Sequence, residues 1–346
     1  MGFKRLESDD FVVSAQSQTS TVWSGNSPTL TTFATQSNQV ESVSGKYYTT
    51  VFNTGSGPTR EAQFEIAYGN STGGGGLAFN SNVNNYSPTT TIYGSYRTLV
   101  LEDENASFIF GDVTGSSIYA LSIERARYKE SLFPGSLNLT LKSGSANDGA
   151  VVVLSDNSKD VTVPTYYGSM RAYQIVSGSN GSAFSGTGYS VSGSYGLFLP
   201  DIGTILLNGD ALDLNQAGGG ISLGTNTSIN TEGNNNQKMF DAIVDGVGSA
   251  PATTPSFGLN SEETITSDFV FVRARNSEFN YSENPSYISG STGEVIYNYF
   301  INNPQTYITT VGLYNDSNEL LATAKLSKPL NKDFTKEALV RVKLDF

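Results

Sequence analysis

The acidic side chains are the residues of this sequence best suited to catalysis. Three of them are consecutive at 102–104, and Asp201, Asp210 and Asp213 surround a predicted hairpin. A glycosidase needs two carboxylic acids about 5 to 10 Å apart, a separation that sequence alone does not define. Because aspartate is also a common turn residue, we interpret both groups as solvated turn acids and predict no catalytic residue.

Asp156, Ser158 and Asp160 have the spacing of the first three ligands of a calcium loop. The glycine at the sixth position and the distal glutamate of that loop are missing, so we predict a hairpin turn here. The glycine-rich segments contain no GxxxxGK[ST] phosphate-binding motif. We therefore expect no metal site and no cofactor.

The chain has neither histidine nor cysteine. Their absence excludes Ser-His-Asp and Cys-His catalysis, disulfides and thiolate metal sites. It also removes the commonest general base, so we predict a protein that is not an enzyme. Such a chain can fold in a reducing cytoplasm.

The formal net charge is −12, which argues against nucleic acid and anionic membranes as partners. The start, MGFKRLESDDF, has no apolar core of a signal peptide, and no apolar run of about 18 residues occurs. We expect neither secretion nor a membrane span.

Composition and periodicity predict the fold class. The chain contains 36 Gly, 19 Tyr and 19 Phe, a mixture typical of strands joined by turns. Between residues 60 and 69, Ala62, Phe64, Ile66 and Tyr68 alternate with other residues, as in a strand with one buried face. We predict a mostly β protein of two or more antiparallel sandwich- or barrel-like modules with few short helices.

Several elements can be placed on the sequence. Residues 95–103 (SYRTLVLED) continue the strand pattern, 149–165 indicate a hairpin, and 195–210 indicate another that turns at Pro200 and Asp201. In 235–248, apolar residues at i, i+1, i+4 and i+5 predict a short helix.

The expected organisation has four parts. An extended N-terminal arm covers 1–45, a β-rich main region of one module or two covers 46–246, a linker covers 247–258, and a C-terminal β module covers 259–346. The arm is polar apart from Trp23, which needs a place to be buried and is a candidate anchor. A flexible tail is the alternative for the arm.

The C-terminal module contains the clearest alternation. Residues 340–346 (VRVKLDF) alternate to the last residue, so a paired strand is expected, with 293–300 and 307–315 as its partners and 315–319 as a turn. Either this sheet is self-contained, or it has an open edge for a neighbouring subunit. The candidate interface residues are Trp23, Val311, Leu313, Leu320, Leu321 and Phe346.

Two segments of this module, FNYSENPSYISGSTGEVIYNYF (279–300) and YITTVGLYNDSNELLATAKLSKPL (307–330), resemble virion proteins of contractile-tailed, T4-like phages of cyanobacteria. GEVIY followed by a terminal strand ending in Phe is similar to the C-terminus of baseplate wedge proteins. N-terminal segments such as FKRLESDDFVVSAQSQTSTVWS (3–24) resemble the same proteins. The Gly/Ser/Asn-rich middle departs from the wedge pattern.

The resemblance implies a non-enzymatic structural protein of a phage tail, wedge-like and in the baseplate. Its partners would be other tail proteins and further copies of itself, and it would be assembled in the host cytoplasm into the virion. Two alternatives stay open. One is a tail spike or fibre that binds or depolymerises carbohydrate, and the other is a head or neck decoration protein.

Overall fold

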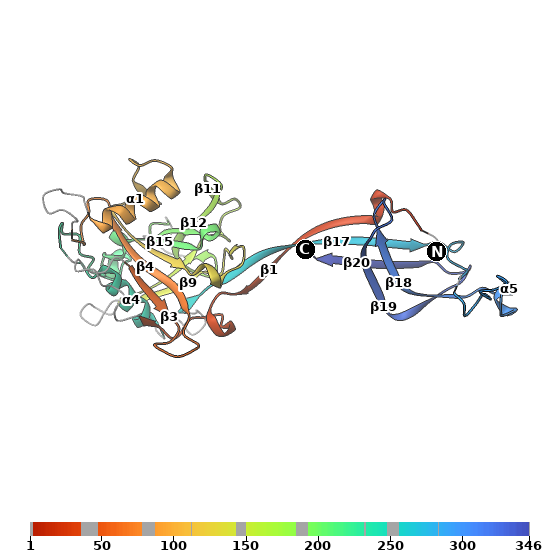
Figure 1. Ribbon diagram of the computed structural model, residues 1–346. Coiled ribbons are helices and arrows are strands. Elements are labelled where there is room, and N and C mark those ends of the chain that lie inside the picture. The colour runs from red at the N-terminus through yellow and green to blue at the C-terminus, as the bar shows by residue number, and fades with distance from the viewer. Residues whose placement is uncertain are drawn as a thin grey trace. The chain divides into compact units, whose positions relative to one another are not determined.

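The computed structural model describes residues 3–35, 48–77, 87–111, 113–142, 150–184, 193–231, 233–247, 256–282 and 284–345. The chain divides into two compact units. Residues 18–263 form one, called here the central unit, and residues 1–17 with 264–346 form the other, called the terminal unit. Both are built mainly of antiparallel strands (Figure 1), so the predicted mostly β fold is confirmed.

A curled sheet organises the central unit, and its neighbouring strands run antiparallel in the order β16-β9-β10-β12-β14-β15-β7-β4-β3-β2. β11 and β13 pair with β12 at its margin, and β5 and β6 form a separate two-stranded ribbon. The strands are β2 (Ala34–Thr35), β3 (Tyr48–Phe52), β4 (Ala62–Asn70), β5 (Phe108–Phe110), β6 (Val113–Gly115), β7 (Ser117–Ile123), β8 (Ser131–Leu132), β9 (Asn138–Lys142), β10 (Val151–Asp156), β11 (Thr165–Tyr167), β12 (Met170–Ser179), β13 (Ser182–Ala183), β14 (Gly196–Leu199), β15 (Thr204–Asn208) and β16 (Phe257–Gly258). The helices are α1 (Pro88–Leu101), α3 (Gly209–Leu212) and α4 (Asn235–Gly246), with 3-10 turns η2 (Ser24–Asn26), η3 (Arg125–Arg127), η4 (Pro200–Ile202) and η5 (Gln216–Gly218).

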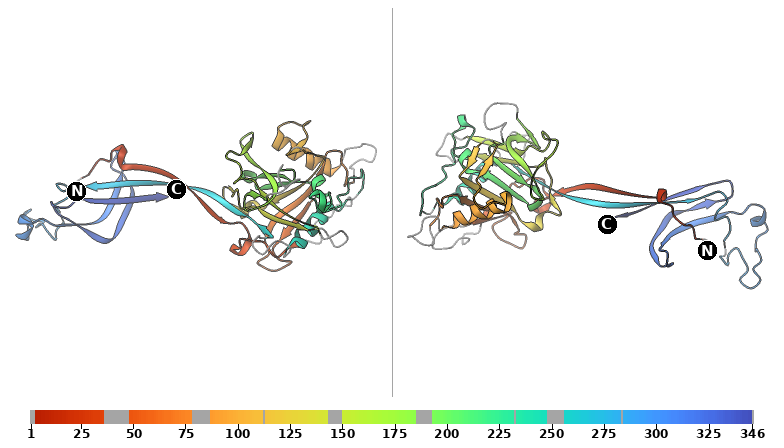
Figure 2. Two further views of the ribbon diagram at one scale, coloured as in Figure 1. Left: turned by 180° about the vertical axis from the view of Figure 1, so that it is seen from behind. Right: turned by 90° about the horizontal axis from the view of Figure 1, so that it is seen from above.

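Both faces of this sheet are buried. Along β7, Tyr119 and Leu121 enter one apolar cluster, whereas Ile118 and Ala120 enter another. Successive side chains of a strand point to opposite faces, so the two clusters lie on the two sides of the sheet. α4 contributes Met239 to the first cluster, and α1 contributes Tyr93 to the second. The two helices lie on opposite sides of the sheet (Figures 1 and 2).

The predicted strand over 95–103 is wrong, because this segment belongs to helix α1. The Ser87 side chain accepts a hydrogen bond from the Thr90 amide and Pro88 starts the helix, so both N-terminal signals of a helix are present. Tyr93, Tyr96 and Val100, spaced i, i+3 and i+7, all pack into the second cluster. Burial of this helical face outweighs the strand preference of the β-branched residues.

The predicted helix near the end of the central unit is confirmed as α4. The hairpin predicted over 195–210 is also confirmed, because β14 pairs with β15 across the 3-10 turn that begins at Pro200. The hairpin predicted over 149–165 is wrong. β10 pairs instead with β9 and β12, and residues 157–164 form the loop that leaves its end.

At Gly196, the pairing of β14 with β15 leaves no room for a side chain. Its φ is 148°, and a Cβ there would lie 1.9 Å from the carbonyl oxygen of Leu206 on the paired strand. We predict that Gly196→Ala lowers the free energy of unfolding of the central unit by about 2–4 kcal/mol. Urea denaturation measures this loss.

The matched control is Gly94→Ala in α1, where a Cβ would have nothing within 4 Å. Alanine is favoured over glycine inside a helix by about 0.5–1 kcal/mol, so this variant should be slightly more stable. Equal stability of the Gly196→Ala chain and the wild type would contradict the packing described for β14.

In its described residues, the terminal unit contains two small sheets. One has the order β1-β17-β20, and the other is the hairpin β18–β19. The elements are η1 (Ser8–Asp10), β1 (Phe11–Thr21), β17 (Asn260–Ala274), α5 (Tyr299–Asn302), β18 (Thr306–Tyr314), β19 (Leu320–Lys332) and β20 (Ala338–Asp345). The turn predicted at 315–319 is confirmed between β18 and β19.

The partners predicted for the last strand are wrong. β20 pairs with β17 from Ser267↔Asp345 to Ala274↔Ala338, whereas 307–314 pair with β19. Residues 293–298 form no strand and contribute only an isolated bridge, Ile288↔Val295. β17 provides a longer alternating partner than either predicted segment, and its Val270 packs opposite Val342.

The segments expected from the sequence are distributed as follows. Of the expected arm, residues 3–17 belong to the terminal unit and 18–35 to the central unit. Most of the expected linker, 248–255, lies outside the described residues. β1 begins in the terminal unit and ends in the central unit, whereas β17 begins in the central unit and ends in the terminal unit. The two strands pair, and the N-terminal segment belongs to the same compact unit as residues 264–346.

Candidate assembly surface

The terminal unit buries few apolar side chains. Both apolar clusters of the described residues lie in the central unit. The buried apolar side chains of the terminal unit are Val270, Ala274, Phe300, Ala338 and Val342. Most of the exposed large hydrophobic side chains belong to this unit, although it is the smaller of the two. Large exposed apolar surface marks a place where another molecule binds.

The β18–β19 hairpin carries four of the candidate interface residues. Val311 and Leu313 are half-buried and pair with Ala324 and Ala322 of the opposite strand. Leu320 and Leu321 are 55% and 69% exposed. The hairpin thus turns Val311 and Leu313 towards its partly covered side and leaves the two leucines in solvent.

An apolar group forms where this hairpin turns. The ring of Phe3 packs edge-on against Tyr314, with 5.2 Å between centroids. Tyr314 pairs with Leu320, and its ring covers Gly312. We call Phe3, Tyr314, Leu320 and Leu321 the hairpin tip. Phe3 was not predicted, because nothing in the sequence links residue 3 to residue 314.

Unpaired strand edges accompany this apolar surface. Within the described residues, β18 and β19 pair only with each other, and β20 pairs only with β17. Each therefore keeps one edge with free backbone N–H and C=O groups. Such edges are templates for strand addition by another chain.

A second exposed apolar group lies in the segment between β17 and β18. Its side chains are Tyr281, Ile296, Tyr297, Tyr299 and Ile301, which are 45% to 68% exposed. Tyr297 and Tyr299 stack with 5.4 Å between ring centroids. Large apolar side chains in a polar segment could have identified this group from the sequence. The predicted strand over 293–300 instead assigned most of them to a sheet.

Trp23 is buried in the central unit and is only 2% exposed. Its indole meets the ring of Phe257 with 4.7 Å between centroids and lies 6.2 Å from that of Phe64. Leu30 donates its amide hydrogen to the Phe257 carbonyl oxygen nearby. The side chain proposed as an anchor therefore fixes residues 22–30 to the core of its own unit. Phe346 lies outside the described residues.

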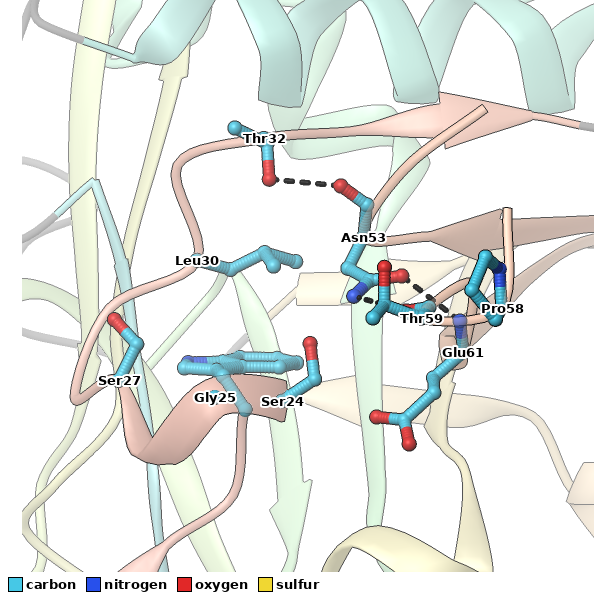
Figure 3. Close-up of a pocket in the computed structure, with 10 residues that line it drawn as sticks. Ser24, Gly25, Ser27, Leu30, Thr32, Asn53, Pro58, Thr59 and Glu61 are labelled. Atoms are coloured by element: carbon cyan, nitrogen blue, oxygen red, sulfur yellow. Dashed lines mark hydrogen bonds between the residues drawn. The ribbon is translucent and has the colours of Figure 1, made fainter. Parts of the chain in front are cut away.

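A pocket of about 410 Å³ opens beside Trp23 in the central unit (Figure 3). Thr32 donates its hydroxyl hydrogen to the backbone oxygen of Asn53, whose side chain bonds the Thr59 carbonyl and the Glu61 amide. These bonds satisfy the Asn53 amide. The pocket therefore lies at a junction between the N-terminal segment and the 53–61 loop.

Asp201, Asp210 and Asp213 are half-buried and accept hydrogen bonds within the fold, so they are not the solvated turn acids that the sequence suggested. Asp201 accepts two hydrogen bonds from the Arg171 guanidinium and one from its amide. Asp210 accepts from the hydroxyls of Ser116 and Ser117. Asp213 accepts from the Thr225 amide, and burial raises the pKa of its carboxyl. These carboxylates are tied to structural partners, whereas those at 102–104 are exposed.

Asp156 is the buried last residue of β10 and pairs with Ile175 of β12, so it does not lie in the hairpin turn that the sequence suggested. Both of its carboxylate oxygens lie 2.7 Å from the Gly135 amide, and the Ser158 hydroxyl donates to one of them. Burial raises the pKa of this carboxyl. Asp160 instead accepts from the Ala183 amide. The two carboxylates therefore serve separate loops.

Lys332 is the one fully buried cation in the described part of the terminal unit. Its Nζ donates to the Asn280 side chain at 2.7 Å and to the carbonyl oxygens of Asp333 and Asn276 at 2.8 and 3.1 Å. Burial lowers the pKa of this ammonium. The lysine ties the end of β19 to the segment that follows β17.

We predict that Lys332→Met destabilises the base of the hairpin by about 1–3 kcal/mol, because buried acceptors are left without a donor. Hydrogen exchange should become faster in 276–280 and 306–332 and stay unchanged in the central unit. Lys328→Met, at an exposed position of the same strand, is the control. Equal protection from hydrogen exchange in the two variants would show that Lys332 does not stabilise the base of the hairpin.

No helix in the described part of the chain is long and apolar enough to cross a membrane. Comparison with protein-family models, with curated proteins and with solved structures finds no match.

Proposed function

We propose that this chain is a non-enzymatic structural subunit of a phage virion, wedge-like and located in the baseplate of a contractile tail. The observation that carries the proposal is the terminal unit, which exposes large apolar side chains and open strand edges and buries few apolar side chains of its own. A unit of this kind gains stability when neighbouring polypeptides cover it.

The size of the effect can be estimated at the hairpin tip. Its side chains are 43% to 69% exposed. At ~200 Å² for each large side chain, the tip leaves roughly 470 Å² to be covered. Burial at about 25 cal/mol per Å² gives a gross gain on the order of 10 kcal/mol, from which the cost of association is subtracted. The exposed area of the tip is thus more than half of a standard interface side of about 800 Å².

Two features support the proposal. Two of the segments that resemble phage tail proteins, 279–300 and 307–330, lie in the terminal unit, and others, such as 3–24, extend into the central unit. The exposed tyrosines and the hairpin tip belong to these segments or contact them. The assignment to a baseplate follows from the resemblance, and the role in assembly follows from the surface.

The test is to find the chain in particles. Purified virions of the phage that encodes it would be analysed by quantitative mass spectrometry, and an antibody to the chain would be located by immunogold microscopy. We expect a fixed number of copies per particle and gold at the baseplate. Gold on fibre tips with release of reducing ends from host polysaccharide would favour the spike alternative, and gold at the head or neck would favour a decoration protein. Absence from the particle would overturn all three.

A further inference from the structure

We propose that copies of this chain join head to tail, with a basic face of the terminal unit bound to an acidic patch on the central unit of a second copy. The proposal rests on the proposed role as an assembly subunit and names one of its partners. It is carried by two surfaces of opposite charge on the same chain.

The basic face is the outer side of the β17–β20 ladder. Directly paired residues share a face of a sheet, and the pairs Phe269↔Lys343, Phe271↔Arg341 and Arg273↔Leu339 follow one another. Leu339 is 59% exposed, and both arginines and the lysine are exposed as well. The opposite side holds the buried Val270 and Val342, so the basic side is the one that faces solvent.

The ionic groups of this face leave positive charge available. Arg341 lies over the Phe269 ring, with 5.5 Å from its guanidinium carbon to the centroid. Lys343 bonds Asp345, which also accepts a hydrogen bond from the Ser267 hydroxyl. On this face, the Asp345 carboxylate therefore balances only one of the three cationic side chains. The half-buried Phe269 and Phe271 add apolar area between them.

The acidic patch surrounds the C-terminal end of α1. Residues 102–104 (Glu-Asp-Glu) are exposed, and Leu99 and Ile109 on either side of them are 47% and 59% exposed. A Cβ on Gly168 would lie 2.5 Å from Glu102 Oε1, so the β11 turn, with Tyr166 56% exposed, borders the same carboxylate. Within the described residues these three acidic side chains form no ion pair.

Charge favours contact between the basic face and the acidic patch over contact between two surfaces of like charge. The central unit holds 10 Lys and Arg against 20 Asp and Glu, and the terminal unit holds 10 against 12, so the positive charge of the terminal unit is local to the basic face. Two central units would repel each other, and so would two basic faces. Contact between the basic face and the acidic patch places cations against carboxylates and apolar side chains against apolar side chains. Because such a contact is heterologous, it extends to rings or filaments.

The test is sedimentation velocity of the full chain at concentrations up to roughly 100 μM. We expect the wild type to associate in about 50 mM salt and to dissociate in about 1 M salt, where charges are screened beyond ~3 Å. Arg273→Glu with Arg341→Glu, and separately Glu102→Lys with Glu104→Lys, should each weaken association at least tenfold. Lys325→Glu with Lys328→Glu, exposed cations of the same unit outside the face, is the matched control and should associate like the wild type.

Charge exchange makes the test specific. A mixture of the basic-face and acidic-patch variants should associate again, and so should a chain that carries all four substitutions, because each restores opposite charges at the contact. A wild type that stays monomeric in about 50 mM salt would overturn the proposal. The proposal would also be overturned if only the basic-face variant lost association, or if combining the two sets of substitutions did not restore association. Circular dichroism of each variant checks folding.

The outcome separates this contact from the proposed function. A chain found in purified tails that never binds itself would overturn the head-to-tail contact and leave the structural role standing. A chain that associates as predicted and is absent from particles would do the reverse.

Discussion

A chain with both Leu320 and Leu321 replaced by Asp is expected to fold normally and to be lost from assembled particles. The two side chains are 55% and 69% exposed, so the isolated chain loses little packing when they change. In an assembly the same positions would be covered, and two carboxylates would have to give up water without partners. We expect incorporation to fall roughly a hundredfold, the consequence of a few kcal/mol at an interface.

Complementation measures this loss. Phage lacking the gene would be grown with a plasmid copy of the wild-type or variant chain, and both infectious titre and chain per particle would be counted. The matched control is Val163→Asp with Phe184→Asp, which changes two exposed apolar residues of the central unit, 69% and 45% exposed. Wild-type titre and copy number with the Leu320/Leu321 variant would show that the hairpin tip is not an assembly contact.

Local alternation in the sequence predicted much of this surface. β18, β19 and β20 have the period of two that identifies a strand, and the Asn and Asp residues between β18 and β19 identify the turn. Leu320 and Leu321 follow that turn, and both are among the candidate interface residues identified from the sequence. A pattern of this kind depends only on near neighbours in the chain.

Pairing over long distances could not be anticipated in the same way. β20 and β17 are separated in the sequence by the whole of the β18–β19 hairpin. Alternation of apolar and polar residues indicates that a strand is paired, but it does not identify the partner strand. The basic face exists only through that register, which aligns Arg341 with Phe271. Phe3 likewise reaches Tyr314 from the other end of the chain.

Competing signals explain the missed helix. In α1, Thr89, Thr90, Thr91 and Ile92 favour strands, and the alternation that follows them suggested another strand. The cap at Ser87 and the face formed by Tyr93 and Val100 outweigh that preference once the sheet offers a surface to cover. The position of the acidic patch follows from this helix, because residues 102–104 end it.

Trp23 shows why a polar context misleads. Apart from Val22, its nearest neighbours in the sequence are Ser, Thr and Gly, which suggested an extended arm reaching towards another subunit. In the structure Ser24 bonds Gln63, and Trp23 joins Phe64 and Phe257 in an aromatic group from three distant segments. The anchor was identified correctly as a residue in need of burial, and the core that receives it belongs to the same chain.

This placement makes a strong prediction about the isolated chain. Trp23→Ala should lower the free energy of unfolding of the central unit by about 3–5 kcal/mol, because it removes a side chain that is 2% exposed and leaves a cavity beside two phenylalanines. Urea denaturation followed by circular dichroism measures the loss. Trp23→Phe, which keeps an aromatic ring, should lose less.

The same experiment separates the two roles that Trp23 could have. A residue that served only to dock on a neighbouring subunit would leave the stability of the isolated chain unchanged when replaced. A shift of the urea midpoint without a change in slope indicates loss of core packing. Unchanged midpoints for both variants would mean that the aromatic group with Phe64 and Phe257 does not stabilise the unit, and that residues 22–30 are held by hydrogen bonds such as those of Ser24 and Leu30.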